Sequence, residues 1–66
     1  MENMIQNRME FLSGIYKIMP VHEAVRVCTA HVRAIQTEIA REGYTLARAE
    51  ELELRKLILD EVRERL

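Results

Sequence analysis

The sequence predicts an all-α protein, and two observations carry that prediction. Apolar residues recur at alternating spacings of four and three along most of the chain, which is typical of helices that pack along a seam. Glycine and proline are scarce among the 66 residues, and Pro20 and Gly43 divide the chain into three periodic segments. We therefore expect one helical domain over residues 1–66, with helices at about 2–18, 21–42 and 46–66.

The middle segment, residues 21–42, contains the clearest seam, and we expect the other two segments to pack against it. Its apolar residues follow one another at spacings of 4, 3, 4, 3 and 4. Small side chains beside this seam, such as Ala24 and Ala30, would allow a neighbouring helix to approach closely. The seam consists of Val21, Val25, Cys28, Val32, Ile35 and Ile39.

The first segment carries two neighbouring apolar rows, a stripe wider than one adjacent helix would cover. We therefore expect part of this stripe to bind a partner, through Phe11, Ile15, Tyr16 and Met19. Gly14 is a weak point within the segment, because glycine costs about 1 kcal/mol relative to alanine inside a helix. The two rows are Ile5, Met9, Leu12, Tyr16 and Met19, and Met4, Phe11, Ile15 and Ile18.

Two joints connect the three segments. Pro20 disfavours helical backbone at Met19 and is tolerated in the first turn of a new helix, which predicts a sharp turn there. A single long helix kinked at Pro20 is the alternative. At the second joint, Gly43 suits the residue just after a helix and Thr45 suits an N-cap, so the flanking helices should form an antiparallel hairpin.

The third segment is apolar over more than half of its circumference, too much for a single hairpin contact. It should therefore pack against the second helix of the same chain and also against a further surface. Charged pairs four residues apart, Glu51–Arg55 and Glu61–Arg65, should each add a few tenths of a kcal/mol. The two apolar rows are Leu54, Ile58 and Val62, and Leu52, Leu59 and Leu66.

So short a chain is usually only marginally stable alone, and homo-oligomerisation is the simplest way to bury the surplus apolar surface. We expect a homodimer, or a higher oligomer, in which two hairpins form a four-helix bundle. The expected interface is made by Val21, Val25, Cys28, Val32, Ile35, Ile39, Leu52, Leu54, Ile58, Leu59 and Val62.

Composition narrows the classes of function. The net charge of −1 is evenly spread, without the basic excess of a nucleic-acid binder. No apolar run reaches the roughly 18 residues of a membrane span, and charges at Glu2, Arg8, Glu10 and Lys17 do not fit a signal peptide. A single cysteine excludes an internal disulfide and suits the reducing cytoplasm, where we expect the protein to act.

Cys28 and His31, three residues apart on one helix, are half of a metal site at most. The chain offers no second Cys or His pair nearby, and a buried thiol beside a histidine is the interpretation we adopt. There is no glycine-rich phosphate loop, no nucleophile elbow and no HExxH motif. We therefore expect no metal, no cofactor and no enzymatic activity.

The function that this pattern favours is a non-enzymatic interaction module, a regulator, adaptor or inhibitor that binds another protein through an apolar helix face. The alternative is an oligomeric binder of a small anionic ligand, such as a nucleotide. In that case bidentate contacts would come from Arg26, Arg33, Arg48 and Arg55, and stacking from Tyr16 or Tyr44 together with His22.

Overall fold

A computed structural model of the chain contains the helices α1 (Met4–Lys17), α2 (Val21–Glu42) and α3 (Leu46–Arg63). It describes the backbone of residues 4–66 and the side chains of residues 7, 8 and 10–66, and this part of the chain holds no strand. The all-α prediction is therefore confirmed. The expected helix start at residue 2, and the side chains of Met4, Ile5 and Met9 in the predicted rows, lie outside the described residues.

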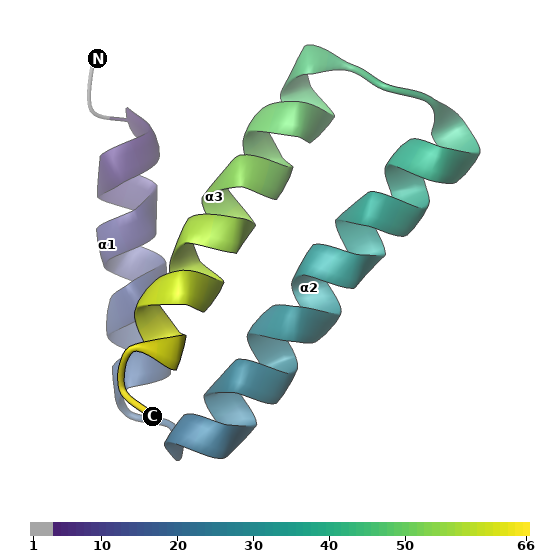
Figure 1. Cartoon of the computed structure of the whole chain (residues 1–66). Coiled ribbons are helices and arrows are strands. Elements are labelled where there is room, and N and C mark those ends of the chain that lie inside the picture. The colour runs from purple at the N-terminus through teal and green to yellow at the C-terminus, as the bar shows by residue number, and fades with distance from the viewer. Residues whose placement is uncertain (1–3) are drawn as a thin grey trace.

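The three helices run up and down along the chain, with α3 packed against both of the others (Figure 1). The helices α2 and α3 form the antiparallel hairpin, and α1 runs parallel to α3. Near Pro20 α1 and α2 lie close together, and from there they diverge towards the other end of the molecule (Figure 1). As a result α1 packs mainly on α3 and makes few contacts with α2.

The chain turns at Pro20 instead of continuing as one kinked helix. The amides just after α1 make tight three-residue turns, with Met19 N–H donating to the Tyr16 carbonyl at 3.2 Å. The new helix begins at once, because Ala24 N–H donates to the Pro20 carbonyl at 2.9 Å. Proline needs no amide partner in this first turn, which is why the joint can be so short.

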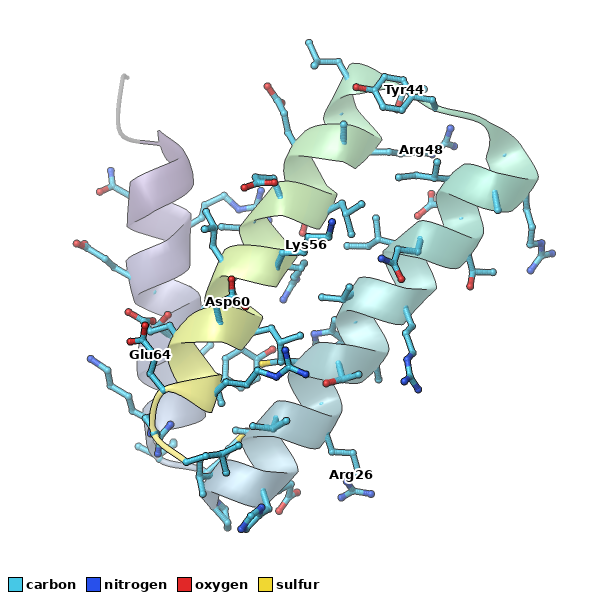
Figure 2. All side chains as sticks on the ribbon, viewed as in Figure 1. Arg26, Tyr44, Arg48, Lys56, Asp60 and Glu64 are labelled. Carbon is cyan, nitrogen blue, oxygen red and sulfur yellow. The ribbon has the colours of Figure 1, made fainter. Side chains whose placement is uncertain are left out.

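The hairpin loop has the two caps that the sequence predicts. Gly43 adopts a positive φ of 103° and its N–H donates to the Ile39 carbonyl at 2.9 Å. The Thr45 hydroxyl accepts the Arg48 N–H at 3.1 Å and so caps α3. The Arg48 side chain also ties the loop to the end of α2, because it donates to the Gly43 carbonyl at 2.9 Å and to Glu38 Oε2 at 3.3 Å. Figure 2 shows Arg48 beside the loop.

The third helix ends at Arg63, three residues before the predicted end at 66. Beyond it the backbone tightens, since Arg65 N–H donates to the Val62 carbonyl and Leu66 N–H to the Arg63 carbonyl, both at 3.0 Å. Such three-residue turns commonly end α-helices.

Arg65 also shows why one predicted charge pair is wrong. Its guanidinium donates to the Tyr16 carbonyl at 2.9 Å and to the Lys17 carbonyl at 3.3 Å, capping the C-terminus of α1. The expected Glu61–Arg65 pair is absent from the described side chains, and Glu61 Oε1 is buried there without a hydrogen-bond partner. The other predicted pair is confirmed, with Arg55 Nε 3.1 Å from Glu51 Oε2.

The core lies where all three helices meet, and it includes part of the predicted oligomer interface. Cys28 and Val32 of the seam are buried inside a single chain, whereas Val21, Val25, Ile35 and Ile39 are half-buried. Because α1 supplies a third wall, this part of the seam is already covered within one molecule. The buried apolar set is Tyr16, Ala24, Cys28, Val32, Leu54, Ile58, Leu59 and Val62, and Val25 and Leu52 pack against it.

Candidate functional site

A polar network begins at the point where α1 and α2 separate. The Tyr16 hydroxyl lies 3.3 Å from His31 Nδ1, and Arg55 Nη1 lies 3.4 Å from the same nitrogen. A guanidinium can only donate, so Nδ1 accepts and the phenol donates as well. One imidazole nitrogen thus connects side chains from all three helices.

The network continues to Glu51, which two arginines share. Arg8 Nη1 lies 3.0 Å from Glu51 Oε1 and Arg8 Nη2 lies 3.2 Å from Oε2, a bidentate pair, while Arg55 Nε lies 3.1 Å from Oε2. Burial by itself would raise the pKa of the Glu51 carboxyl, but the hydrogen bonds and charges of Arg8 and Arg55 outweigh it and lower that pKa. Two positive charges therefore face one negative charge.

The innermost members of this region are uncharged. Burial raises the pKa of the Cys28 thiol, although the neighbouring Tyr16 and the Arg55 charge oppose it. Burial also raises the pKa of the Tyr16 phenol, with the nearby Cys28 adding to the effect. A buried thiol with a raised pKa is poor at nucleophilic chemistry, because the thiolate is the reactive form.

Two hollows open on either side of Arg55, between the diverging helices. The larger has a volume of about 370 Å³ and is lined by Asn7, Arg8, Phe11 and Leu12 of α1 together with Arg55. The smaller has a volume of about 200 Å³ and is lined by His31, Ala34 and Ile35 of α2 together with Glu51 and Arg55. We call this region the α1–α2 groove. Its walls come from α1 and α2 and its floor from α3.

Beside the groove, α1 exposes a row of large apolar side chains. Phe11, Ile15 and Ile18 are 71%, 44% and 86% exposed, and their spacing of four and three places them along one side of the helix. Two other residues predicted to bind a partner, Tyr16 and Met19, are not part of this exposed row. Tyr16 is only 6% exposed and Met19 is half-buried against the core, because their row is the one that packs inward.

The four arginines predicted to bind an anion do not gather in one place. Arg26 and Arg33 are exposed, and their spacing of seven places both on the side of α2 away from Cys28. Figure 2 shows Arg26 pointing away from the other helices. Arg48 is paired with Glu38 at the hairpin loop, and Arg55 with Glu51 in the groove. Within one chain, only Arg55 of the four contributes to the groove.

The described residues contain no cluster of three or more His, Cys, Asp or Glu side chains that could hold a metal ion. In the same part of the chain, no helix combines the length and the apolar character required to cross a membrane.

Sequence reasoning missed three contributors to the groove and its rim. Arg8 meets Glu51 across 43 residues of sequence, a distance at which spacing gives no signal. The sequence presents His31 only as a neighbour of Cys28 and gives no signal that it accepts hydrogen bonds in the groove. Ile18 belongs to the second apolar row, and that row could have identified it as an outward-facing neighbour of Phe11 and Ile15.

Together these features define a small three-helix protein with a polar-floored groove and an exposed apolar helix face. Comparison of the chain with protein-family models, with curated proteins and with solved structures found no match.

Proposed function

We propose that this protein is a non-enzymatic interaction module, a regulator, adaptor or inhibitor that acts in the cytoplasm and binds another protein through α1. The observation that carries the proposal is the exposed row of Phe11, Ile15 and Ile18, with Ile18 86% exposed. Single exposed apolar residues are common on protein surfaces, but a contiguous apolar row on a small protein is typical of an interaction site.

The position of the row on α1 supports this proposal. The opposite side of the helix holds the protein together, since Tyr16 is buried and Leu12 packs against the core. The exposed row is therefore surplus to the fold, and its spacing of four and three suits an apolar stripe on a partner helix.

A second copy of the chain is the competing occupant of the same row. A homodimer through α1 would bury Phe11, Ile15 and Ile18 without using the seam of α2, which is partly enclosed in one chain. Native mass spectrometry of the purified protein separates the two cases, because it reports the oligomeric state directly. A monomer leaves the row available to another protein.

The proposal is tested by capturing partners from a cell extract with the wild-type protein and with Phe11→Asp and Ile18→Asp. We expect the same partner to be captured by the wild type and lost with either variant, because a carboxylate on the row must be desolvated on binding. Both positions are exposed, so circular dichroism should show unchanged helix content.

Leu46→Asp is the matched control. Leu46 is an apolar residue that is 69% exposed at the start of α3, and it does not belong to the row. Capture should survive this change. A partner retained by both α1 variants and lost with Leu46→Asp would move the binding surface to the hairpin end and overturn the proposal.

A further inference from the structure

The α1–α2 groove has the layout of a helix bundle that lacks one member. The helices α1 and α2 both pack on α3 and diverge from Pro20, so a fourth helix laid over α3 would contact all three (Figure 1). The two hollows lie along this path, one against α1 and one against α2, with Arg55 between them.

Each wall of the groove carries apolar side chains beside its polar ones. Phe11 and Leu12 line the α1 side, and Ala34 and Ile35 line the α2 side. Phe11 is 71% exposed, so its ring is available both to the groove and to the outer row of α1. Side chains of this kind bind the apolar stripe of an amphipathic helix.

The charged side chains that line the groove are two arginines and one glutamate, which leaves one positive charge in excess. Arg8 and Arg55 share the single carboxylate of Glu51, and both oxygens of that carboxylate are already engaged. Each guanidinium has five N–H donors and spends only some of them on Glu51 and His31. A second carboxylate brought into the groove would meet unused donors and balance the charge.

From these observations we propose that the α1–α2 groove binds an acidic amphipathic helix, whose apolar stripe packs between Phe11 and Ile35 and whose carboxylate meets Arg8 and Arg55. The inference rests on the proposed function and adds the chemistry of the partner. It selects against basic helices, because a lysine brought to the same place would face two guanidiniums.

The test uses three fluorescently labelled synthetic helical peptides with the same leucine stripe. The positions beside the stripe are all Glu in the first peptide, all Gln in the second and all Lys in the third. Binding is measured by fluorescence anisotropy with the full chain. We expect the Glu peptide to bind at least about tenfold more tightly than the Gln peptide, and the Lys peptide to bind most weakly.

Two substitutions at Ala34 locate the site without disturbing the Arg8–Glu51–Arg55 contacts. Ala34 is exposed on the α2 wall of the groove. We expect Ala34→Glu to weaken the Glu peptide about tenfold and Ala34→Lys to strengthen it. Arg8→Glu should shift the preference towards the Lys peptide, with circular dichroism as the check that α1 remains folded.

Arg26→Glu is the matched control for a general charge effect, because Arg26 is exposed near the start of α2 and lines neither hollow. It should leave the ranking of the peptides unchanged. If all three peptides bind equally well, or if Arg26→Glu acts as strongly as Ala34→Glu, the acidic-helix inference is overturned. Absence of binding by every peptide also overturns it, as does a homodimer that excludes all of them.

The failure of this inference and that of the proposed function can be told apart. Peptides that bind irrespective of charge, and are lost with Phe11→Asp, leave the interaction module standing without its acidic partner. If binding of the Glu peptide changes with the Ala34 substitutions but not with Phe11→Asp, the groove recognises charge and the apolar face of α1 takes no part in binding. Displacement of the Glu peptide by acetate alone would instead assign the floor to small carboxylates and overturn the helix as occupant.

Discussion

The hydroxyl of Tyr16 lies 3.3 Å from Nδ1 of His31, and this contact joins the last turn of α1 to the middle of α2. Arg55 of α3 reaches the same nitrogen at 3.4 Å. The point at which the two helices separate is therefore fixed by side chains and not only by the short joint. The α2 residues that line the groove, Ala34 and Ile35, lie beyond this contact towards the hairpin loop.

Removal of the Tyr16 hydroxyl should loosen this junction. We expect Tyr16→Phe to lower the free energy of unfolding by about 0.5–1.5 kcal/mol, the usual net contribution of a hydrogen bond, because the ring still fills the core. Urea unfolding monitored by circular dichroism measures the change. Tyr44→Phe is the control, since Tyr44 is 73% exposed in the hairpin loop and should cost almost nothing. Equal effects of both changes would mean that the Tyr16–His31 contact does not stabilise the fold.

The two glycines should respond to alanine in opposite ways. Gly14 is helical and nothing lies within 4 Å of the position of a new Cβ, so Gly14→Ala should stabilise the protein by about 0.5–1 kcal/mol. Gly43 has φ of 103°, which an L side chain rarely adopts, so Gly43→Ala should destabilise it by about 1 kcal/mol or more. Thermal unfolding of the two variants beside the wild type measures both. Shifts of the same sign would contradict the backbone conformation at one of the two sites.

The buried row of α3 should be the most sensitive part of the chain. Ile58 is 1% exposed, and Ile58→Ala should cost about 2–5 kcal/mol, enough to unfold much of so small a protein. Leu46 also lies in α3 but is 69% exposed, so Leu46→Ala should change stability by less than about 0.5 kcal/mol. Chemical denaturation compares the two. A costly Leu46→Ala change would indicate that the start of α3 is covered by another molecule.

Acid should weaken the fold through Glu51. Its pKa is lower in the folded protein than the ordinary value of 4.5, so the folded state binds fewer protons there than the unfolded chain. This contribution is present above pH 4.5 and is lost as the pH falls through the lower folded value. Unfolding free energies measured from about pH 6 to about pH 2 should fall less steeply for Glu51→Gln than for the wild type. Glu53 is exposed on the same helix. Glu53→Gln should therefore change the dependence of the unfolding free energy on pH less than Glu51→Gln does.

Alkali should weaken the fold through Cys28 and Tyr16. Both pKa values are raised from their ordinary values of 9.0 and 10.0, mainly by burial, so the folded protein holds these protons more tightly than the unfolded chain. The resulting stability is complete below the ordinary values and is lost as the pH rises through the folded ones. Cys28→Ala and Tyr16→Phe should each reduce the alkaline loss of stability, as measured by denaturation across this range. A slope unchanged in both variants would place the titrating groups elsewhere.

Much of the local structure could be read from the sequence. Apolar spacing predicted the three helices, Pro20 predicted the turn, and Gly43 with Thr45 predicted the hairpin caps. The Glu51–Arg55 pair was also predictable. Each of these features depends on residues within about one helical turn of each other, where spacing and backbone preference decide the outcome.

Only the tertiary structure decided which apolar face became core and which stayed exposed. Both rows of α1 have helical spacing, yet Tyr16 is buried while Phe11 is 71% exposed, because α3 and the start of α2 cover just one of them. Likewise Arg8 meets Glu51 across 43 residues of sequence. Arg65 does not pair with Glu61 and instead caps the C-terminus of α1. Periodicity fixes where a side chain stands around its own helix axis. It does not fix which distant helix will cover that side chain, because this depends on how three amphipathic surfaces share one small core.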